Sequence, residues 1–245
     1  TARNVMAAAI LRSVQVGLPR THGVGEESEP MSRAWTTGFY KEPVVGPVWV
    51  GATNLDGDGQ ADLALHGGPD KAVCVYPAAH YPYWRATLNL LTLPPGSFGE
   101  NFTVEGLTEA GVCVGDIWTV GEATLQVSQP RQPCWKLARR WGIKDLALRV
   151  QQTGRTGWYF RVLREGFVES GMSLTLVERP HPEWTVERAN RVMHHDRDDH
   201  AAAEELGQLP VLSASWRATL IRRVTQGVQP DEAKRLFGPL AEGRG

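Results

Sequence analysis

Residues 112–137 read VCVGDIWTVGEATLQVSQPRQPCWKL, and they carry the pattern that decides the fold. Two short runs, 117–120 and 123–127, are rich in β-branched and apolar residues and are bounded by turn residues, which is typical of strands. The prolines that follow end the second run and impose a rigid loop. A helix is predicted over 134–150, because proline suits the first turn of a helix. The chain thus passes from two strands through a loop that precedes Cys134 into a helix.

Similar apolar runs recur through residues 1–180, a region that contains 21 of the 26 glycines. Short strands separated by Gly, Pro, Asn and Asp favour a closed or folded-over β structure. The further strands are predicted at residues 9–16, 44–50, 72–76, 102–104, 112–114 and 173–177, and after Gly157. One more helix is predicted over 76–91, opened by Pro77. The fold class is therefore mixed and mostly β, and the Gly-, Glu- and Ser-rich segment 17–31 is predicted to be a mobile surface loop.

The sequence changes character near Pro180, after which only five glycines occur. Polar N-cap residues followed by apolar residues at helical spacing predict three helices in this region. They begin after Thr185, near residue 201, and at Ser213 or Ser215, and the last ends at Gly227. We therefore predict a first domain over 8–180, a three-helix domain over 181–228 and a tail over 229–245.

Composition excludes several classes of protein. The 245 residues carry 26 basic and 27 acidic side chains, so the formal net charge is −1. Hydrophobic residues make up 42% and charged residues 22%, which is typical of soluble globular proteins. Broad nucleic-acid binding leaves a basic footprint that this balance does not provide. No apolar run approaches the roughly 18 residues that span a bilayer, and the run after Met6 is too short for a secretory signal. Neither nucleic acid nor a membrane is expected as a partner.

The three cysteines, Cys74, Cys113 and Cys134, form an odd and sparse set. Such a set indicates a reducing compartment rather than a disulfide framework, so a cytoplasmic location is expected. Cys74 and Cys113 alternate with valines in predicted strands and are interpreted as small buried hydrophobes.

Residues 54–62 read NLDGDGQAD and match the first half of a calcium-binding loop. The twelfth position of such a loop requires a bidentate Glu, but Leu65 stands there. The flanks also resemble strand and turn instead of two helices. An acidic β-turn, rather than a calcium site, is expected here.

Two glycine-containing turns carry polar side chains that suit ligand binding. The motif HGGPDKA at 66–72 has two glycines that allow positive φ beside a lysine, and either a phosphate cradle or a solvated connecting turn fits it. The side chains of this turn are His66, Asp70 and Lys71. The motif GSFGENF at 96–102 places Glu100 and Asn101 after a flexible turn, where they hydrogen-bond a heterocycle or brace the turn.

Cys134 has the most suggestive chemical surroundings. Its predicted place at a helix N-terminus, with Arg131 and Lys136 nearby, favours the thiolate. A thiolate there is a nucleophile or a ligand for a soft metal, and a small buried hydrophobe is the alternative. In GRTGWYF at 154–160, Arg155 suits an anionic group, and the aromatic residues suit a hairpin that packs on the core.

The cluster HHDRDDH at 194–200 contains three histidines and three aspartates. Its spacing matches no metal-ligand pattern. A solvated helix terminus followed by an Asp-rich cap for the next helix is the preferred interpretation.

Four motifs, in this order along the chain, resemble the MOSC domain, which is named after the C-terminal domain of molybdenum cofactor sulfurase. They are HGGPDKA (66–72), GENFTVEGL (99–107), VGD (114–116) and QPRQPC (129–134). With GRTGWY (154–159), ANRVM (189–193) and LSASWR (212–217), residues 8–226 are similar to the YiiM family, in which three helices follow a MOSC domain.

The resemblance implies a β-barrel-like MOSC fold with flanking helices and a molybdenum cofactor, in which the dithiolene of a molybdopterin holds one molybdenum atom. It also carries a family-level association with pyridoxal phosphate. The cofactor can be absent from purified proteins of this kind. The implied activity is reduction of N-hydroxylated compounds such as 6-hydroxylaminopurine, written N–OH + 2e⁻ + 2H⁺ → N–H + H₂O.

The resemblance and the motifs together assign site residues. The catalytic set is Cys134, Asp70 and His66, with Cys134 as the molybdenum ligand. The cofactor-binding set is Lys41, Gly67, Gly68, Lys71, Glu100, Asn101, Arg131, Gln132, Lys136 and Arg155.

The sequence lacks a Rossmann fingerprint, an Fe–S cysteine set and a flavin motif, so a separate electron-donating reductase is expected as a partner. The substrate is expected to be a small N-hydroxylated molecule, and the protein to be a monomer or homodimer. Two alternatives remain. One is a sulfur-carrier or molybdenum-cofactor-handling protein without reductase activity, and the other is a regulatory or scaffolding module whose helical tail binds a partner.

Overall fold

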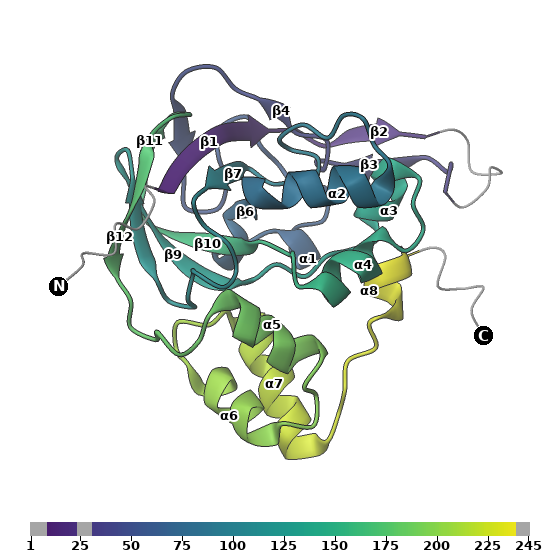
Figure 1. The fold of residues 1–245 in the computed structure, drawn as a ribbon, viewed down its shortest axis with the longest axis vertical. Helices are drawn as coiled ribbons and strands as arrows, with labels where there is room; N and C mark the ends of the chain where they lie inside the picture. Colours follow the sequence, from purple (N-terminus) through teal and green to yellow (C-terminus); the bar gives the residue numbers. More distant parts are fainter. Residues whose placement is uncertain (1–8, 24–30, 239–245) are drawn as a thin grey trace.

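The structure, a computed structural model, describes residues 9–23 and 31–238 (Figure 1). Seven of its strands close into a barrel, because β12 pairs with β1 as well as with β8. Neighbouring strands of the barrel are antiparallel except β6 and β7, which run parallel. Around the ring they are β12 (Ser173–Glu178), β8 (Ile117–Val120), β9 (Ala123–Pro130), β10 (Trp158–Arg164), β6 (Val73–Pro77), β7 (Phe102–Glu105) and β1 (Ala9–Val16). The predicted mixed, mostly β fold is confirmed.

Alternation of side chains along the strands fills the barrel. In β1, Ala9, Leu11 and Val14 are buried, and an irregularity in the pairing with β7 between Leu11 and Ser13 shifts the alternation by one residue. Trp158 and Phe160 of β10 are fully buried in the same core. The interior is therefore packed with side chains, and a ligand must bind at the outside of the barrel or at its end.

Short strands lie outside the ring of seven barrel strands. Residues 20–22 (β2, Arg20–His22) pair with β3 (Trp35–Thr37), and β4 (Glu42–Pro43) pairs with β1. The strand β5 (Val48–Val50) pairs with β11 (Gly166–Val168). The loop predicted at 17–31 thus contains a strand, and its residues 24–30 lie outside the described part of the chain.

Two strand predictions are wrong in part. Residues 112–114 form no strand, because the backbone N–H of Cys113 donates to Asp116 Oδ2 and turns the chain. Cys113 makes only an isolated β-bridge, with Thr185, among the described residues. The strand predicted at 44–50 is reduced to β5, because the turn at Gly46-Pro47 interrupts it.

Both helix predictions in the first domain differ from the structure. Pro77 is the last residue of β6, and the chain enters α2 (Tyr81–Leu88) only after a 3₁₀ turn at Ala78–His80. The helix predicted over 134–150 is two helices, α3 (Lys136–Trp141) and α4 (Leu146–Thr153), because α3 ends at its C-cap Gly142. A cluster around Trp84 and Phe98 buries these helices against one side of the barrel.

The three helices predicted in the C-terminal part are confirmed. They are α5 (Val186–His194), α6 (His200–Gln208) and α7 (Ala214–Gln226), which form the lower part of Figure 1. The N-caps Thr185 and Ser213 accept hydrogen bonds from backbone N–H groups of the first turns, as expected, and Gly227 is the C-cap of α7. Their core surrounds Trp184 and Trp216.

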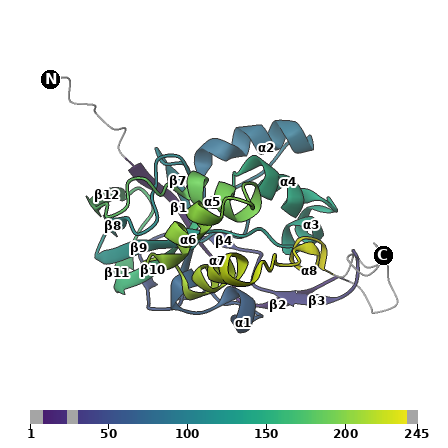
Figure 2. The same cartoon turned by 90° about the horizontal axis from the view of Figure 1, so that it is seen from below.

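Hydrogen bonds join the helices to the barrel, and the view from below in Figure 2 shows α5, α6 and α7 in front of it. The backbone N–H of Ser213, the N-cap of α7, donates to the Ser128 carbonyl of β9 at 2.9 Å. Asn190 of α5 donates to Thr156 Oγ1 at 2.8 Å. Barrel and helices therefore meet next to the end of β9.

The segment predicted as a tail, 229–245, includes a helix that sequence reasoning missed. This helix, α8 (Ala233–Phe237), packs on α4 and buries Leu236 in the cluster that covers the barrel. In Figure 1 it is the yellow helix beside α4, far from α7. The chain thus leaves the three helices and returns to the first domain.

Residues 194–200 differ from their prediction only at His194, which is buried and donates from Nδ1 to Glu232 at 2.8 Å. His195 and residues 198–200 are exposed, as a solvated helix terminus requires. Asp199 does cap α6, accepting from the Ala202 backbone N–H. Within the described residues no group of three His, Cys, Asp or Glu side chains has a metal-binding arrangement.

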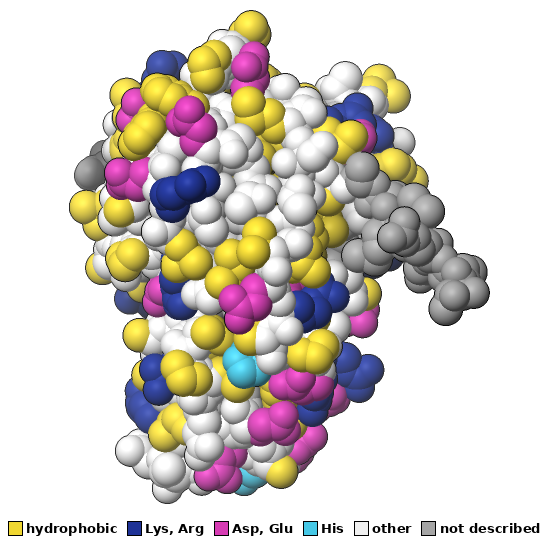
Figure 3. All heavy atoms as spheres, turned by 90° about the vertical axis from the view of Figure 1, so that its left-hand side faces the viewer, with side chains coloured by type: hydrophobic (Ala, Val, Ile, Leu, Met, Phe, Trp, Pro, Cys, Tyr) yellow, Lys and Arg dark blue, Asp and Glu magenta, His cyan; other side chains and the backbone are white. Residues whose placement is uncertain are grey.

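None of the helices in the described ranges combines the length and apolarity that crossing a bilayer requires. On the face shown in Figure 3, acidic and basic side chains are interspersed with hydrophobic ones. That face offers no extended basic surface, in keeping with the net charge of −1.

Candidate functional site

The end of β9 and the loop after it place Cys134 in a cavity beside the barrel. Pairing of β9 with β10 continues to Pro130, and the Arg131 backbone N–H still donates to the Gly157 carbonyl at 3.1 Å. The loop then carries Cys134 to the start of α3, where its carbonyl accepts from the Leu137 N–H at 3.1 Å. Cys134 is 8% exposed and lines the cavity. It lies two residues before the first residue of α3, so its prediction at a helix N-terminus is approximately right.

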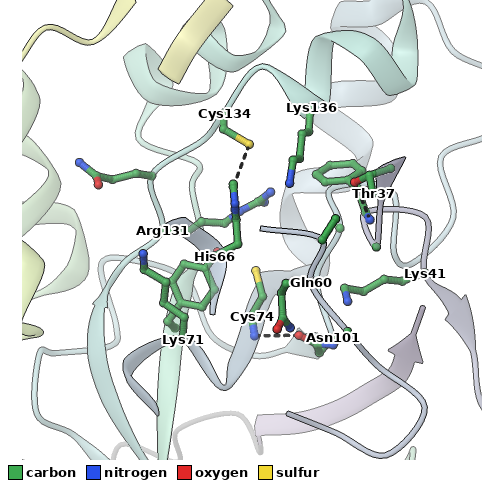
Figure 4. Close-up of a pocket in the computed structure, with 17 residues that line it drawn as sticks. Thr37, Lys41, Gln60, His66, Lys71, Cys74, Asn101, Arg131, Cys134 and Lys136 are labelled. Atoms are coloured by element: carbon green, nitrogen blue, oxygen red, sulfur yellow. Dashed lines mark hydrogen bonds between the residues drawn. The ribbon is translucent and has the colours of Figure 1, made fainter. Parts of the chain in front are cut away.

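His66 faces Cys134 across this cavity (Figure 4). It is the last residue of a one-turn helix, α1 (Leu63–His66), which Asp62 caps by accepting from the Leu65 N–H. His66 Nε2 lies 3.6 Å from Cys134 Sγ, and its Nδ1 is buried without a hydrogen-bond partner in the described structure. Burial, with the charges of Lys136 and Lys71, lowers the pKa of His66 to about 4. The imidazole is therefore neutral at neutral pH.

Basic side chains surround the pair. Arg131 is buried and donates from Nη2 to the Phe98 carbonyl at 2.5 Å, but its Nη1 has no partner among the described residues. Lys136 is 8% exposed, and no carboxylate of the described residues pairs with it. In Figure 4 its amine points into the cavity. Charge of this kind in a partly dry site suits an anionic ligand.

Two further lysines line the cavity but are engaged by the protein. Lys41 forms a buried ion pair with Asp58, which also accepts from the Gly17 backbone N–H. Lys71 donates to the Leu65 carbonyl at 2.6 Å, and burial lowers its pKa. The acidic turn predicted at 54–62 therefore supplies a counter-ion for Lys41.

The floor of the cavity contains residues that sequence reasoning did not assign to the site. Cys74 lines it, and so does Tyr159, which is its partner in the β6–β10 register. Burial raises the pKa of both groups, so the thiol and the phenol keep their protons at neutral pH. Period-two alternation along β10 was the available signal, because Trp158 and Phe160 in the core force Tyr159 to the other face. Gln60 and Thr37 also line the cavity, and no sequence signal singled them out.

Asn101 and Gln132 line the cavity as predicted. Asn101 Oδ1 accepts from the Cys74 N–H at 3.0 Å, and its Nδ2 donates to the Gln15 carbonyl at 3.3 Å. The amide thus holds β6 beside β1 while it borders the cavity.

Several predicted site residues lie elsewhere. Asp70 pairs with Arg161 at 2.7 Å and accepts from the Ala214 N–H, at the junction with α7. Glu100 is fully buried and accepts from the N–H groups of Gly96 and Phe98, so it braces its turn. The guanidinium of Arg155 lies 3.9 Å from the centre of the Tyr83 ring. These three side chains do not line the cavity, nor do Gly67 and Gly68, which form the turn after α1.

A second, more open hollow adjoins the first and shares Gln60, His66 and Lys136 with it. Its other walls include Leu65 and Trp135. The Cys134–His66 pair therefore adjoins a second space that offers an indole ring and an aliphatic side chain beside polar groups.

Comparison with known proteins agrees with this organisation. Residues 62–175 match the MOSC domain model, and residues 184–227 match the YiiM-like, 3-alpha helix domain model. YflK of Bacillus subtilis is 51% identical over 187 residues, which are 76% of this chain and 84% of that protein. YiiM of Escherichia coli is 40% identical over 202 residues, 81% of this chain and 89% of that protein.

A protein named reductase from Gibberella moniliformis is 38% identical over 184 residues, which are 72% of this chain but only 32% of that longer protein. The crystal structure of YiiM from Geobacillus stearothermophilus has a TM-score of 0.74 at 40% identity, covering 89% of this chain and all of that one. The crystal structure of YiiM from Escherichia coli has a TM-score of 0.73 at 38% identity, covering 80% of this chain and 94% of that one. Since barrel, helices and sequence agree over most of both chains, this protein belongs to the YiiM family of MOSC-domain proteins.

Proposed function

We propose that the protein is a molybdenum-cofactor-dependent reductase of N-hydroxylated compounds such as 6-hydroxylaminopurine. The reaction is R–NHOH + 2e⁻ + 2H⁺ → R–NH₂ + H₂O. The observation that carries the proposal is the buried Cys134–His66 pair in a cavity whose remaining side chains are mostly basic or neutral. The relative named reductase supports an oxidoreductase.

The residues present fit such a cofactor. A thiolate at Cys134 is the soft donor that molybdenum chemistry calls for. No three protein ligands converge in the described residues, so a metal at Cys134 needs further ligands that come with the cofactor itself. The unpartnered Arg131 Nη1 and the unpaired Lys136 supply the positive charge that a phosphate-bearing pterin requires.

When bound, the cofactor would supply the two electrons that cleave the N–O bond. The chain holds Cys134 by the rigid loop after β9 and turns the neutral His66 toward it. With Nε2 donating to the sulfur, Nδ1 of His66 is left as an acceptor for a donor on the ligand. This arrangement orients both the metal ligand and the bound group.

Anion binding in the proposed site falls mainly to Arg131 and Lys136. Lys41 and Lys71 already bond to Asp58 and to a backbone carbonyl, so they add positive potential but fewer free donors. Tyr159 keeps its proton at neutral pH and offers a hydroxyl at the floor of the cavity. The adjoining hollow, which Trp135 and His66 both line, is the side from which a flat substrate would approach His66. A separate reductase would deliver the electrons.

The test is to express the chain and its Cys134→Ser variant in cells that make molybdenum cofactor. Molybdenum per chain and dye-coupled reduction of 6-hydroxylaminopurine are measured for both. We expect metal and turnover in the parent and neither in the variant, because a hydroxyl is a poor soft-metal ligand. Cys113→Ser is the matched control, since Cys113 is buried away from the cavity with its thiol on the Pro182 carbonyl.

Two results would contradict the proposal. Molybdenum without turnover on any N-hydroxylated compound would favour a cofactor-handling protein. An equal metal content in parent and Cys134→Ser would remove Cys134 as the ligand.

A further inference from the structure

The C-terminal segment 232–238 lies against the loop that carries Cys134. The helix α8 packs on α4, and Leu236 is buried in the cluster that also contains Leu137 of α3. This segment follows the part of the chain that matches the YiiM-like, 3-alpha helix domain, which ends at residue 227. Its contacts are therefore additional to those of the two matched domains.

Arg235 makes two hydrogen bonds that flank Cys134, one as a donor and one as an acceptor. Arg235 Nη1 donates to the carbonyl of Pro133 at 2.5 Å, and the carbonyl of Arg235 accepts from the Trp135 backbone N–H at 2.8 Å. The two peptide groups next to Cys134 are thus held by one residue of α8. Hydrogen bonds between distant segments restrict a loop most when they bracket the same short stretch, as these do.

A third contact holds the side chain of Trp135. A Cβ added to Gly238 would lie 2.4 Å from the indole, so the ring packs directly on the glycine backbone. Gly238 has φ +54° and ψ −127°, a conformation that side chains disfavour. Trp135 also borders the hollow that leads to His66.

Glu232 fixes Arg235 from the opposite direction. Arg235 Nη2 donates to Glu232 at 2.7 Å and to Gln151 Oε1 at 2.7 Å. Glu232 in turn accepts from His194 of α5 and from Arg197. The guanidinium therefore links the three-helix domain, α4 and the Cys134 loop. A planar guanidinium can donate to all three acceptors at once, whereas a single amine cannot.

We propose that Arg235 is a positioning residue for Cys134, and that α8 joins the three-helix domain to the Cys134 loop through it. The proposal concerns how the chain holds this thiol. It holds whatever group binds there, so its test uses the cofactor-free protein.

The experiment compares the full-length parent with Arg235→Met, which keeps the stem of the side chain but removes its donors. Lys234→Met is the matched control, because Lys234 is an exposed cation on the same helix whose side chain has no ion pair or hydrogen bond among the described contacts. Backbone hydrogen exchange is followed by mass spectrometry for peptides covering 131–137. In parallel, the rate of alkylation of Cys134 is measured at one fixed pH from its own peptide.

We expect Arg235→Met to speed exchange in 131–137 by about tenfold and to change the Cys134 alkylation rate, while strands β6 and β12 exchange as in the parent. Lys234→Met should match the parent. Arg235→Lys keeps one donor for the Pro133 carbonyl and should recover part of the protection, which a loss of packing alone would not allow.

Gly238→Ala provides a second route if Arg235→Met unfolds, because its Cβ displaces Trp135 without removing a charge; it should also loosen 131–137. The proposal is overturned if 131–137 exchanges at the parental rate in a folded Arg235→Met protein. It is also overturned if Arg235→Lys is as fast as Arg235→Met. Neither result depends on molybdenum or on reductase activity, so a failure here is separate from a failure of the proposed function.

Discussion

Lys41 and Lys136 bring two amines into the same cavity, but within the described residues only Lys41 has a carboxylate partner. A buried charge without a counter-ion costs stability, because desolvation is not offset by attraction. The Lys41–Asp58 pair is therefore a structural element of the cavity wall. Lys136 is the amine whose charge is left for a ligand.

Removal of the counter-ion at Lys41 should destabilise the fold. Asp58→Ala leaves a buried ammonium unpaired and should lower the free energy of unfolding by about 3–5 kcal/mol. Asp56→Ala, in the same turn but exposed, should change it by less than about 0.5 kcal/mol. Urea unfolding followed by tryptophan fluorescence measures both. Equal effects of the two substitutions would refute the assignment.

Substitution of Lys136 should change the free energy of unfolding in the opposite direction. Lys136→Met removes an unpaired, poorly solvated charge and should raise the free energy of unfolding of the cofactor-free protein by about 1 kcal/mol, while it weakens retention of an anionic cofactor. Lys144→Met, on an exposed lysine near α4, is the control. Urea denaturation of cofactor-free protein and metal analysis of protein from cofactor-producing cells give the two readings. A destabilised Lys136→Met protein would show that this amine is already satisfied.

At this scale the sequence predicted Cys134, His66, Arg131 and Lys136 from local chemistry and motif order. It missed Cys74 and Tyr159, because the sequence of one strand does not show which residue of the neighbouring strand lies opposite. It also assigned Asp70 to the site, although Arg161 and the start of α7 attract this carboxylate to the domain junction.

At the scale of elements, the approach of β6 to the start of β10 decides whether the cavity floor forms. Gly157 stands at this point with φ +71°, and a Cβ there would lie 2.0 Å from the Val75 carbonyl oxygen. Gly154, in the same turn motif, also has positive φ, but a Cβ there meets nothing within 4 Å. The two glycines share a conformation and differ in available space.

This difference gives a matched pair of substitutions. Gly157→Ala should lower the free energy of unfolding by about 3 kcal/mol, because it adds a steric clash with the backbone to the cost of positive φ. Gly154→Ala should cost only about 1 kcal/mol, the conformational part alone. Thermal unfolding of both variants checks the order. A larger loss in Gly154→Ala would contradict the assigned register of β10 on β6.

Helix boundaries show what local patterns leave undecided. Thr185 and Ser213 were predicted correctly, since capping is a local interaction between a side chain and the next turn. The break between α3 and α4 was missed, although Gly142 marks it, because apolar spacing continues across the glycine. The strand predicted at 112–114 was wrong because Asp116 offers the backbone a turn that competes with a ladder.

At the scale of the whole molecule, Glu232 joins three parts of the chain. Burial alone would raise the pKa of Glu232, but the hydrogen bond from His194 and the charge of Arg235 lower it to about 2. Arg197 and Gln151 also donate to this carboxylate. A lowered pKa means that the ionised form stabilises the fold at neutral pH, and that this contribution is lost as the pH falls from about 4.5 through about 2.

The parent and Glu232→Gln should therefore differ by about 3 kcal/mol in the free energy of unfolding at pH 7, and the difference should shrink steadily below pH 4.5. Glu204→Gln, an exposed carboxylate of α6, should show no such pH dependence. Urea unfolding curves from pH 7 down to pH 3 provide the measurement. A parent–variant difference that stays constant over this range would show that Glu232 is not held ionised by its partners.

The sequence by itself determined the strand pattern, the three capped helices, the basic surroundings of Cys134 and the order of motifs that identifies the family, because all of these rest on local spacing. Only the tertiary structure decided that His66 lies 3.6 Å from Cys134, that Asp58 neutralises Lys41, and that α8 returns to hold the Cys134 loop. Each of these contacts joins segments far apart in the chain. Barrel closure and packing bring them together, and periodicity along one segment carries no information about such partners.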